Sequence, residues 1–297
     1  MERTPLALVT SDLHFSDKMP RCRQEKDWLG YQEGVIDWLK DTCDDLSVPA
    51  ILVGDIFDRH KHSNELVNLL IDKMPMSFVT FGNHDISGHC PELKHKSAYG
   101  TFIRSKVATE MNEVREMDGV NIHPFHFGHE SSICEETKGI NIALVHEFVW
   151  QNNEPFPGCP PKGEVNELVK RFQGYDIIFA GDHHEYFTAQ VGDTTVVNCG
   201  SLMRISASQC SYQPVVHLLY TDGHVEQIEV PIGHDKISNE HLTAKSEIED
   251  KIESFVSTLE RNEEIEQLTF EERISRAIIS SEANGNIEEI LREAMNG

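Results

Sequence analysis

Aspartate, asparagine and histidine side chains recur in this sequence directly after apolar segments. Five successive apolar runs end in side chains that can bind a metal ion: Asp12 and His14, Asp55, Asn83 and His84, His146, and Asp182 with His184. Burying so many carboxylates and imidazoles together is costly unless a cation compensates for them. One such residue alone would be typical of a turn or a helix cap, but the five runs together predict a metal site.

The types of ligand indicate which chemistry this site performs. Oxygen and imidazole ligands without cysteine suit Mn, Fe or Zn, and suit Ca less well. The ligands are too many for one ion, so we expect a carboxylate to bridge two ions about 3.5–4 Å apart. Such a pair lowers the pKa of a shared water and stabilises the charge that builds on a phosphoryl group. Cleavage of a phosphate ester is therefore the reaction that the pattern favours.

The segments that carry these residues alternate between strands and helices. Apolar runs predict strands at 6–14, 50–55, 77–85, 139–147, 175–184, 194–202 and 214–230. Apolar residues at a helical period predict helices over 24–46 and 64–73, the second with Ser63 as its N-cap. This alternation is typical of a layered α/β domain, in which functional residues gather at the carboxyl ends of the strands.

The order of these elements predicts two parts. Residues 1–235 form the catalytic domain, in which Asp222-Gly223 turns a hairpin between antiparallel strands. Residues 241–297 contain 14 acidic and 6 basic residues, a net charge of −8, and their apolar residues repeat at a helical period. We expect this second part to be an acidic, helical C-terminal tail.

Five short motifs resemble those of the calcineurin-like metallophosphoesterases. They are D-L-H at 12–14, G-D-I-F-D-R at 54–59, G-N-H-D at 82–85, His146 at a strand end, and G-D-H-H at 181–184. They occur in order and span about residues 6–205. Within this superfamily the chain is most similar to the SbcD nucleases, the nuclease subunits of SbcCD-type DNA recombination and repair complexes, which include viral versions. G-D-I-F-D and N-C-G-S-L-M-R at 198–204 carry that likeness, which implies a layered β-sandwich flanked by helices.

The resemblance also implies a role for each motif residue. Two divalent ions, Mn²⁺ first among the candidates, would be bound by seven side chains. Asp12, His14, Asp55 and His184 would hold the first ion, and Asp55, Asn83, His146 and Asp182 the second, with Asp55 as the bridge. His84 would not be a ligand. Oriented by Asp85, it would stabilise charge at the scissile phosphate or protonate the leaving oxygen.

Two positions leave alternatives open. The family commonly has His-x-His in its last motif, where this chain has Asp182; a carboxylate there favours harder cations, so Mn over Zn, and a second register makes His183 the ligand. Arg59 either grips phosphate bidentately, as in phosphoprotein phosphatases that resemble this motif, or is a surface arginine paired with Asp58. The three histidines of 123–129 are not favoured as a metal site, because a proline and a glycine argue against the helix that would align them.

The expected partners follow from the resemblance and from the charge. SbcD-type nucleases dock helices that follow the catalytic domain onto the coiled-coil base of an SbcC-type ATPase, and the helices expected at 245–296 resemble that arrangement. The chain has no G-x-x-x-x-G-K-[ST] motif, so the ATPase would be a separate polypeptide. DNA is the substrate that this relationship implies. Because the net charge of the chain is −24, the partner would supply much of the DNA contact.

Other interpretations stay open at this point. The acidic charge favours a stand-alone phosphatase or small phosphodiesterase, since a nuclease that acts alone should carry a basic groove. The tail is alternatively a helical pair that closes the domain on its own sheet. A third hypothesis is a catalytically dead scaffold, and a homodimer is neither predicted nor excluded.

Composition indicates where the protein works. Seven cysteines without a C-x-x-C pair are typical of reduced thiols. No apolar run approaches the ~20 residues of a membrane span, and the N-terminus has no signal-peptide pattern. We therefore expect a cytoplasmic protein that is not associated with a membrane.

Overall fold

The computed structural model describes residues 3–135, 138–151, 159–233 and 235–239. The chain divides into two units, residues 1–237 and 238–297, and the described residues belong almost entirely to the first. The helical tail expected over 241–297 therefore lies outside the described residues, and the domain boundary stays a prediction.

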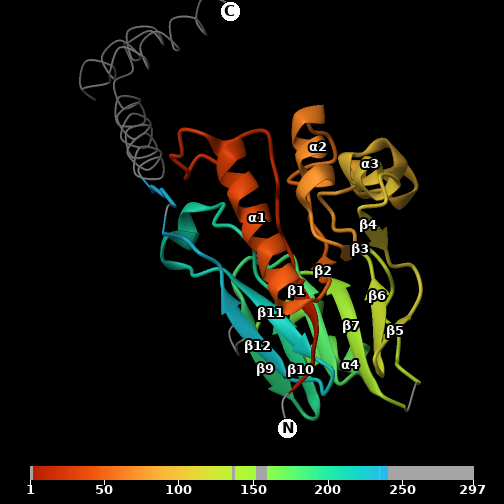
Figure 1. Cartoon of the computed structure of the whole chain (residues 1–297). Helices are drawn as coiled ribbons and strands as arrows, with labels where there is room; N and C mark the ends of the chain where they lie inside the picture. Colours follow the sequence, from red (N-terminus) through yellow and green to blue (C-terminus); the bar gives the residue numbers. More distant parts are fainter. Residues whose placement is uncertain (1–2, 136–137, 152–158, 234, 240–297) are drawn as a thin grey trace, which may run out of the picture. The chain divides into compact units, whose positions relative to one another are not determined.

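Two six-stranded β-sheets organise the described unit (Figure 1). The first sheet has the strand order β12-β11-β1-β2-β3-β4 and the second the order β5-β6-β7-β8-β10-β9. The strands of the first sheet are β1 (Pro5–Thr10), β2 (Ala50–Val53), β3 (Ser77–Thr80), β4 (Ala108–Glu110), β11 (Val215–Tyr220) and β12 (Val225–Glu229). Those of the second are β5 (Arg115–Met117), β6 (Val120–Phe125), β7 (Ile140–His146), β8 (Ile177–Gly181), β9 (Phe187–Val191) and β10 (Thr194–Asn198).

Parallel strands form one side of the first sheet, as far as its edge strand β4, and the centre of the second sheet. In the first, β1 to β4 are parallel neighbours, and in the second β6, β7, β8 and β10 are. The remaining strands pair antiparallel at the edges. Parallel strands end at a common edge, so the residues that follow them are brought together.

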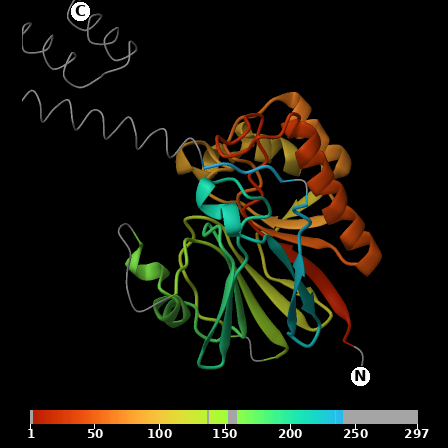
Figure 2. The same ribbon diagram turned by 90° about the vertical axis from the view of Figure 1, so that its left-hand side faces the viewer.

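Helices cover the outer faces of the two sheets (Figure 1 and Figure 2). Helices α1 (Trp28–Leu46), α2 (Asn64–Lys73) and α3 (Ala98–Arg104) pack on the first sheet. Helix α4 (Val165–Arg171) packs on the second. The short 3₁₀ helices are η1 (Ser87–His89), η2 (Pro91–Lys96), η3 (Pro161–Gly163) and η4 (Ala207–Ser211). The α/β fold expected from the sequence, a β-sandwich flanked by helices, is confirmed.

Three apolar layers explain why the central strands read as continuous apolar runs. Leu8 of β1 packs toward the helices, whereas Val9 packs between the two sheets. On β7, Leu144 lies between the sheets and Val145 faces the layer that contains α4. Strands with both faces buried lose the polar-apolar alternation of a half-exposed strand.

Local signals fix the main helices and the hairpin. Helix α1 begins at Trp28, four residues later than the expected segment, because the Asp27 carboxylate accepts a hydrogen bond from Gly30 N (2.9 Å) and so caps the helix. Helix α2 spans the expected residues, with Ser63 as its cap. The predicted turn at Asp222-Gly223 joins antiparallel β11 and β12.

A buried ion-pair cluster anchors the segment after β12. Asp235, whose side chain is 1% exposed, accepts hydrogen bonds from Arg23 Nη1 (2.9 Å) and Arg204 Nε (3.0 Å). Arg23 also pairs with Glu25, and its guanidinium lies 4.2 Å from the centre of the Tyr31 ring. Arg204, from the N-C-G-S-L-M-R motif, therefore has a structural role.

Among the described residues, no helix combines the length and the apolar character that crossing a membrane requires.

Candidate metal centre

The strand-end residues of both sheets converge at one place. His146, at the end of β7 in the second sheet, lies with Nδ1 2.7 Å from the carbonyl oxygen of Val53, the last residue of β2 in the first sheet. A carbonyl oxygen only accepts, so Nδ1 carries a proton, and in the neutral imidazole Nε2 keeps the lone pair. The contact joins the two sheets and fixes the tautomer that a metal ligand needs.

The backbone turns sharply at several of these strand ends. Asp12 (φ 50°), His14 (φ 47°), Asp55 (φ 49°) and Asp182 (φ 76°) all adopt the left-handed conformation. Residues other than glycine rarely do so, although Asp and His tolerate it better than most. Asp12, Asp55 and Asp182 lie one or two residues after the end of a strand. The turn at each of them directs the chain across the edge of the sheets.

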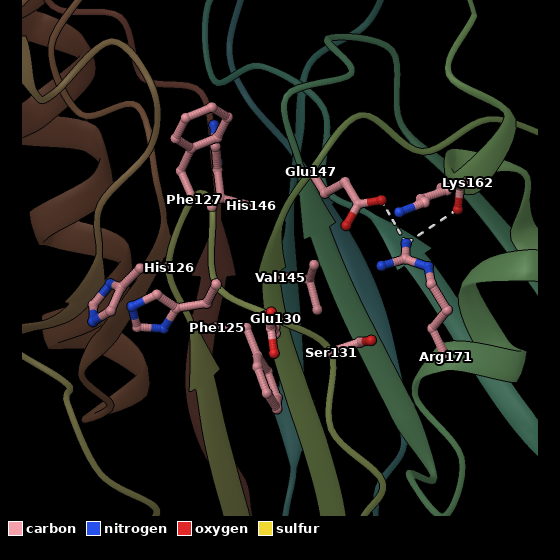
Figure 3. Close-up of a pocket in the computed structure, with 12 residues that line it drawn as sticks. Phe125, His126, Phe127, Glu130, Ser131, Val145, His146, Glu147, Lys162 and Arg171 are labelled. Carbon is pink, nitrogen blue, oxygen red and sulfur yellow. Dashed lines mark hydrogen bonds and ion pairs between the residues drawn. The ribbon is translucent and has the colours of Figure 1, made fainter. Parts of the chain in front are cut away.

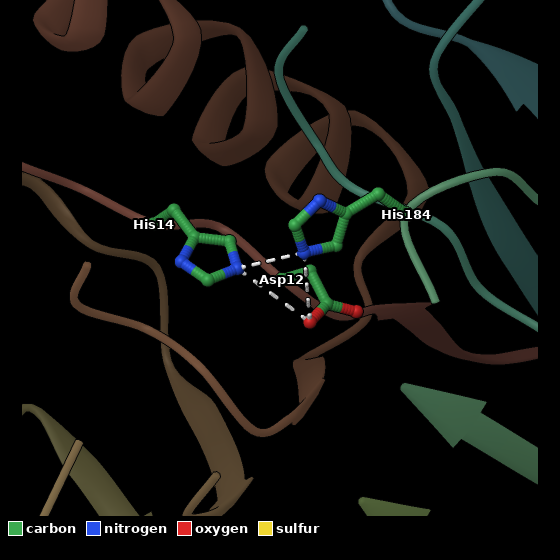
Figure 4. Close-up of side chains that lie close together, drawn as sticks. All are labelled: Asp12, His14 and His184. Atoms are coloured by element: carbon green, nitrogen blue, oxygen red, sulfur yellow. Dashed lines mark hydrogen bonds and ion pairs between the residues drawn. The ribbon is translucent and has the colours of Figure 1, made fainter. Parts of the chain in front are cut away.

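Three overlapping groups of acidic and histidine residues form the centre. They are Asp12, His14 and His184; His14, Asp55 and His84; and Asp12, Asp55 and His146. Within each group the ligand atoms lie within 4.8 Å of one another. Figure 4 shows the first group, in which the Nε2 atoms of His14 and His184 lie 3.1 Å apart and Asp12 Oδ1 lies 3.7 Å from His14 Nε2.

Asp55 links the groups. Its Oδ2 lies 3.3 Å from His146 Nε2 and 3.7 Å from His14 Nε2, and its Oδ1 accepts a hydrogen bond from the backbone N–H of His84 (2.9 Å). The carboxylate is buried, and Oδ2 has no hydrogen-bond donor among the described residues. This position is the one expected of a bridging ligand.

The residues fit divalent cations. The Nε2 atoms of His14 and His184 lie 3.1 Å apart, and the buried Oδ2 of Asp55, which has no hydrogen-bond donor among the described residues, lies 3.7 Å from His14 Nε2. A cation bound among these atoms would compensate for the buried carboxylate. The donors are oxygen and imidazole nitrogen, which suit Mn, Fe or Zn. Glycine at 82 also keeps this space open, because a Cβ there would lie 2.6 Å from His146 Nε2.

Electrostatics favour the metal-binding forms of Asp55 and His184, whereas His146 must lose a proton to bind a metal ion. Burial alone would raise the pKa of Asp55, but the nearby His146 and His14 hold it below its ordinary value, so the carboxylate is ionised. Burial lowers the pKa of His184 to about 4, so its imidazole is neutral near pH 7. Burial also opposes protonation of His146, yet Asp55 raises the pKa of His146 to about 10 in the metal-free protein.

The remaining predicted ligands differ in how close they lie to the three groups of candidate metal ligands. Asn83 Oδ1 lies 3.1 Å from His146 Nε2, within the cluster. The backbone N–H of Asp182 donates to both carboxylate oxygens of Asp12, but the Asp182 carboxylate belongs to none of the three groups found among the described residues. The ring of His183 stacks on Phe148, and its Nδ1 lies 2.7 Å from a backbone carbonyl, which does not favour the register with His183 as ligand.

His84 belongs to one of the three groups, although it was not expected to be a ligand, and its hydrogen-bond partner differs from the expected one. Its ring centre is 4.9 Å from that of His14, and its Nδ1 lies 2.6 Å from the carbonyl oxygen of Asp58. The oxygens of Asp85 instead accept hydrogen bonds from the backbone N–H groups of Phe57 (3.0 Å) and Gly82 (2.9 Å). The expectation that Asp85 orients His84 is therefore wrong: Asp85 holds two loops together, and burial together with Asp55 raises its pKa to about 7.

Arg59 stands at the margin of the centre. Its side chain is 61% exposed, and its Nε and Nη2 each lie 3.3 Å from Asp58 Oδ2. In this conformation it is the surface arginine paired with Asp58, and a grip on phosphate would need it to leave that partner.

One supporting residue has no signal in the motifs. His126 is buried, its ring stacks on Phe81 with centres 4.2 Å apart, and its Nδ1 accepts a hydrogen bond from Phe81 N (3.1 Å). Phe81 immediately precedes the G-N-H-D loop, so His126 supports that loop from behind. None of the candidate metal groups among the described residues contains a histidine of 123–129.

A family model and several solved structures are similar to this chain. Residues 6–186 match the family model described as calcineurin-like phosphoesterase. Similar solved structures include an archaeal phosphodiesterase (16% identity, TM-score 0.40, covering 75% of this chain and 98% of that one) and Vacuolar Protein Sorting 29 from Cryptosporidium parvum (15%, 0.40, 80% and 97%). A putative 5'-nucleotidase from Staphylococcus aureus is also similar (14%, 0.46, 82% and 58%). No curated protein matches the chain. The assignment below rests on the family model alone.

Proposed function

The chain belongs to the calcineurin-like phosphoesterase family, whose activity is metal-dependent hydrolysis of phosphoesters, and from that premise we propose that it is the nuclease subunit of an SbcCD-like complex. It would act as a DNA exonuclease or endonuclease with two divalent ions, Mn²⁺ first among the candidates. The observation that carries the hydrolase part is the convergence of Asp12, His14, Asp55, His146 and His184 from distant strand ends of both sheets.

The resemblance assigns these side chains to two ions. Asp12, His14, Asp55 and His184 would hold one ion, and Asp55, Asn83, His146 and Asp182 the other. When bound, such ions supply Lewis acidity and lower the pKa of water. The protein contributes a buried, preorganised set of donors that need not rearrange as charge develops on the phosphate.

His84 is suited to move a proton at the leaving oxygen. Because its Nδ1 donates to the Asp58 carbonyl, that nitrogen carries a proton and Nε2 is the atom left to exchange one with the substrate. Histidine is the side chain most often used for such proton transfers.

Two considerations bear on the substrate. The likeness of the motifs to SbcD nucleases favours DNA, with an SbcC-type ATPase bound through residues 245–296, which lie outside the described residues. The net charge of −24 favours the alternative, a stand-alone phosphatase or small phosphodiesterase. We give the nuclease precedence because a partner that supplies DNA contacts removes the electrostatic objection.

Three substrates separate these functions. With Mn²⁺, the full chain should hydrolyse bis(4-nitrophenyl) phosphate, a diester, faster than 4-nitrophenyl phosphate, a monoester. End-labelled duplex DNA should be degraded faster when a co-purified coiled-coil ATPase is added. Faster turnover of the monoester, with no action on DNA in either condition, would favour the phosphatase. No turnover of any substrate would favour the scaffold.

A further inference from the structure

A pocket of about 530 Å³ adjoins the candidate metal centre (Figure 3). Its walls come from the segment 125–131 at and after the end of β6, from the end of β7 (145–147), from Lys162 in η3 and from Arg171 at the end of α4. His146 belongs both to this pocket and to the metal centre. A molecule held in the pocket would therefore lie next to the metal centre. The volume is within the ~300–1,000 Å³ of small-molecule sites.

The side of the pocket formed by α4 and η3 carries two cations. Arg171 is 24% exposed, and both of its hydrogen bonds are made by Nη2, to Glu147 Oε1 and to the carbonyl oxygen of Lys162 (3.1 Å). Nη1 makes no hydrogen bond with the described residues, and the ammonium of the exposed Lys162 forms no ion pair with them. Glu147 thus fixes the guanidinium plane but leaves it able to bind an anion, and arginine is well matched to phosphate.

The facing side of the pocket is aromatic. Figure 3 shows Phe125 and Phe127 across the pocket from Arg171. His126 lies on the same side, but it is buried and its ring is stacked on Phe81. Aromatic side chains are the surfaces on which proteins stack single-stranded bases, whatever the base sequence.

The mixture of charges narrows the class of ligand. Glu130 and Glu147 line the same pocket as the two cations. A ligand with several anionic groups inside the pocket itself, or a purely apolar molecule, would meet unfavourable neighbours there. A nucleotide unit suits all three features, since it has an anionic phosphate, an aromatic base and N–H groups that a carboxylate can accept.

We propose that this pocket binds the nucleotide next to the scissile phosphodiester, with Arg171 and Lys162 on its flanking phosphate and the aromatic wall against its base. The proposal rests on the proposed phosphodiesterase function. It adds that the substrate binds as a single-stranded nucleic-acid segment that lies across the metal centre. Contacts to phosphate position the strand and carry no sequence preference.

The test measures binding apart from catalysis. Fluorescence anisotropy with labelled hexathymidylate, in EDTA so that no cleavage occurs, gives the Kd of the full chain. Arg171→Gln should raise that Kd about tenfold, and the slope of log K against log salt should become shallower by about 0.7, as for one lost phosphate contact. Lys170→Gln is the matched control, because this neighbouring lysine is 66% exposed and pairs with Glu167 instead of lining the pocket. It should bind like the wild type.

A kinetic comparison completes the test. In Mn²⁺, the ratio of kcat/KM for the oligonucleotide to kcat/KM for bis(4-nitrophenyl) phosphate should fall about tenfold in Arg171→Gln, through KM. If Arg171→Gln lowers the Tm because Arg171 no longer pairs with Glu147, Lys162→Gln provides the same test, since the Lys162 side chain is exposed. The proposed nucleotide site is refuted if the wild type does not bind the oligonucleotide. It is also refuted if Arg171→Gln, Lys162→Gln and Lys170→Gln all bind it equally well. Failure of the wild type to hydrolyse either diester overturns the proposed function instead, while the EDTA measurement still decides the pocket.

Discussion

Replacing Asp55 by asparagine should abolish the stabilisation of the protein by divalent cations. Asp55 belongs to two of the three ligand groups, and its Oδ2 lies within 3.7 Å of imidazole nitrogens from His14 and His146. Asparagine keeps the shape and removes the charge, so both groups lose their shared anion while the loop around them retains its side-chain volume.

The size of the effect follows from electrostatics and mass action. A unit charge pair at about 4 Å contributes about 4 kcal/mol at an effective dielectric constant near 20, which weakens binding of each ion by roughly a thousandfold when it is lost. At a concentration 100 times the wild-type Kd, one ion stabilises the folded state by about 2.7 kcal/mol, or about 5–11 °C in Tm for a domain of this size. At the same concentration the variant should gain less than about 0.1 kcal/mol, and its Tm should not move.

Thermal unfolding in EDTA and after titration with MnCl₂, followed by circular dichroism, measures these shifts for each variant against its own metal-free baseline. Asp222→Asn is the control, since Asp222 is 51% exposed and pairs with Arg3 at the hairpin turn. It should show the wild-type shift. A manganese-dependent rise of several degrees in Asp55→Asn would refute the assignment of Asp55 as the shared ligand.

Three further outcomes follow from the site and the core. His84→Gln should keep the manganese-dependent rise in Tm but lose about 10²–10⁴-fold in kcat, and retained turnover of the diester would contradict its role. In EDTA, the Tm should fall as the pH rises from about 6.5 toward 10. Burial opposes protonation of His146 in the folded protein, but Asp55 raises its pKa to about 10, against 6.5 in the unfolded chain. The stabilisation from this proton is therefore complete below pH 6.5 and is lost as the folded protein releases the proton. A flat profile would show that the pair is not coupled in this way. Asp235→Ala should cost about 3–5 kcal/mol of unfolding free energy, because two buried arginines lose their shared carboxylate, with the manganese-dependent shift in Tm unchanged. Chemical denaturation measures that loss, and a value below ~1 kcal/mol would argue against a structural role for the cluster.

The strand-end residues could be predicted from the sequence because their signal is strong and local. Each follows an apolar run, and β2 and β7 begin and end within two residues of the expected segments, whereas β1 ends four residues earlier than expected. The helices α3 and α4, seven residues each, were not expected, and neither were β4 and β5, with three residues each, because such short elements show too little periodicity.

The interactions that support the site were less predictable, since they depend on backbone atoms and on packing. The atom that orients His84 is the carbonyl oxygen of Asp58, which any residue would supply, so residue types point to Asp85 instead. His126 supports Phe81 across 45 residues of sequence through stacking and one hydrogen bond, and neither leaves a motif. The pocket beside His146 also joins side chains of α4 and β6 that have no shared pattern.

The left-handed backbone at Asp12, His14, Asp55 and Asp182 affects how sequence variants will be tolerated. A Cβ in that conformation is disfavoured by roughly 1–2 kcal/mol, and glycine avoids the clash. In a saturation library sorted only for cellular abundance, glycine and asparagine should therefore gain frequency at these four positions. The same library sorted for hydrolysis should discard them, so the positions where the two enrichment profiles diverge most would outline the centre before any natural substrate is known.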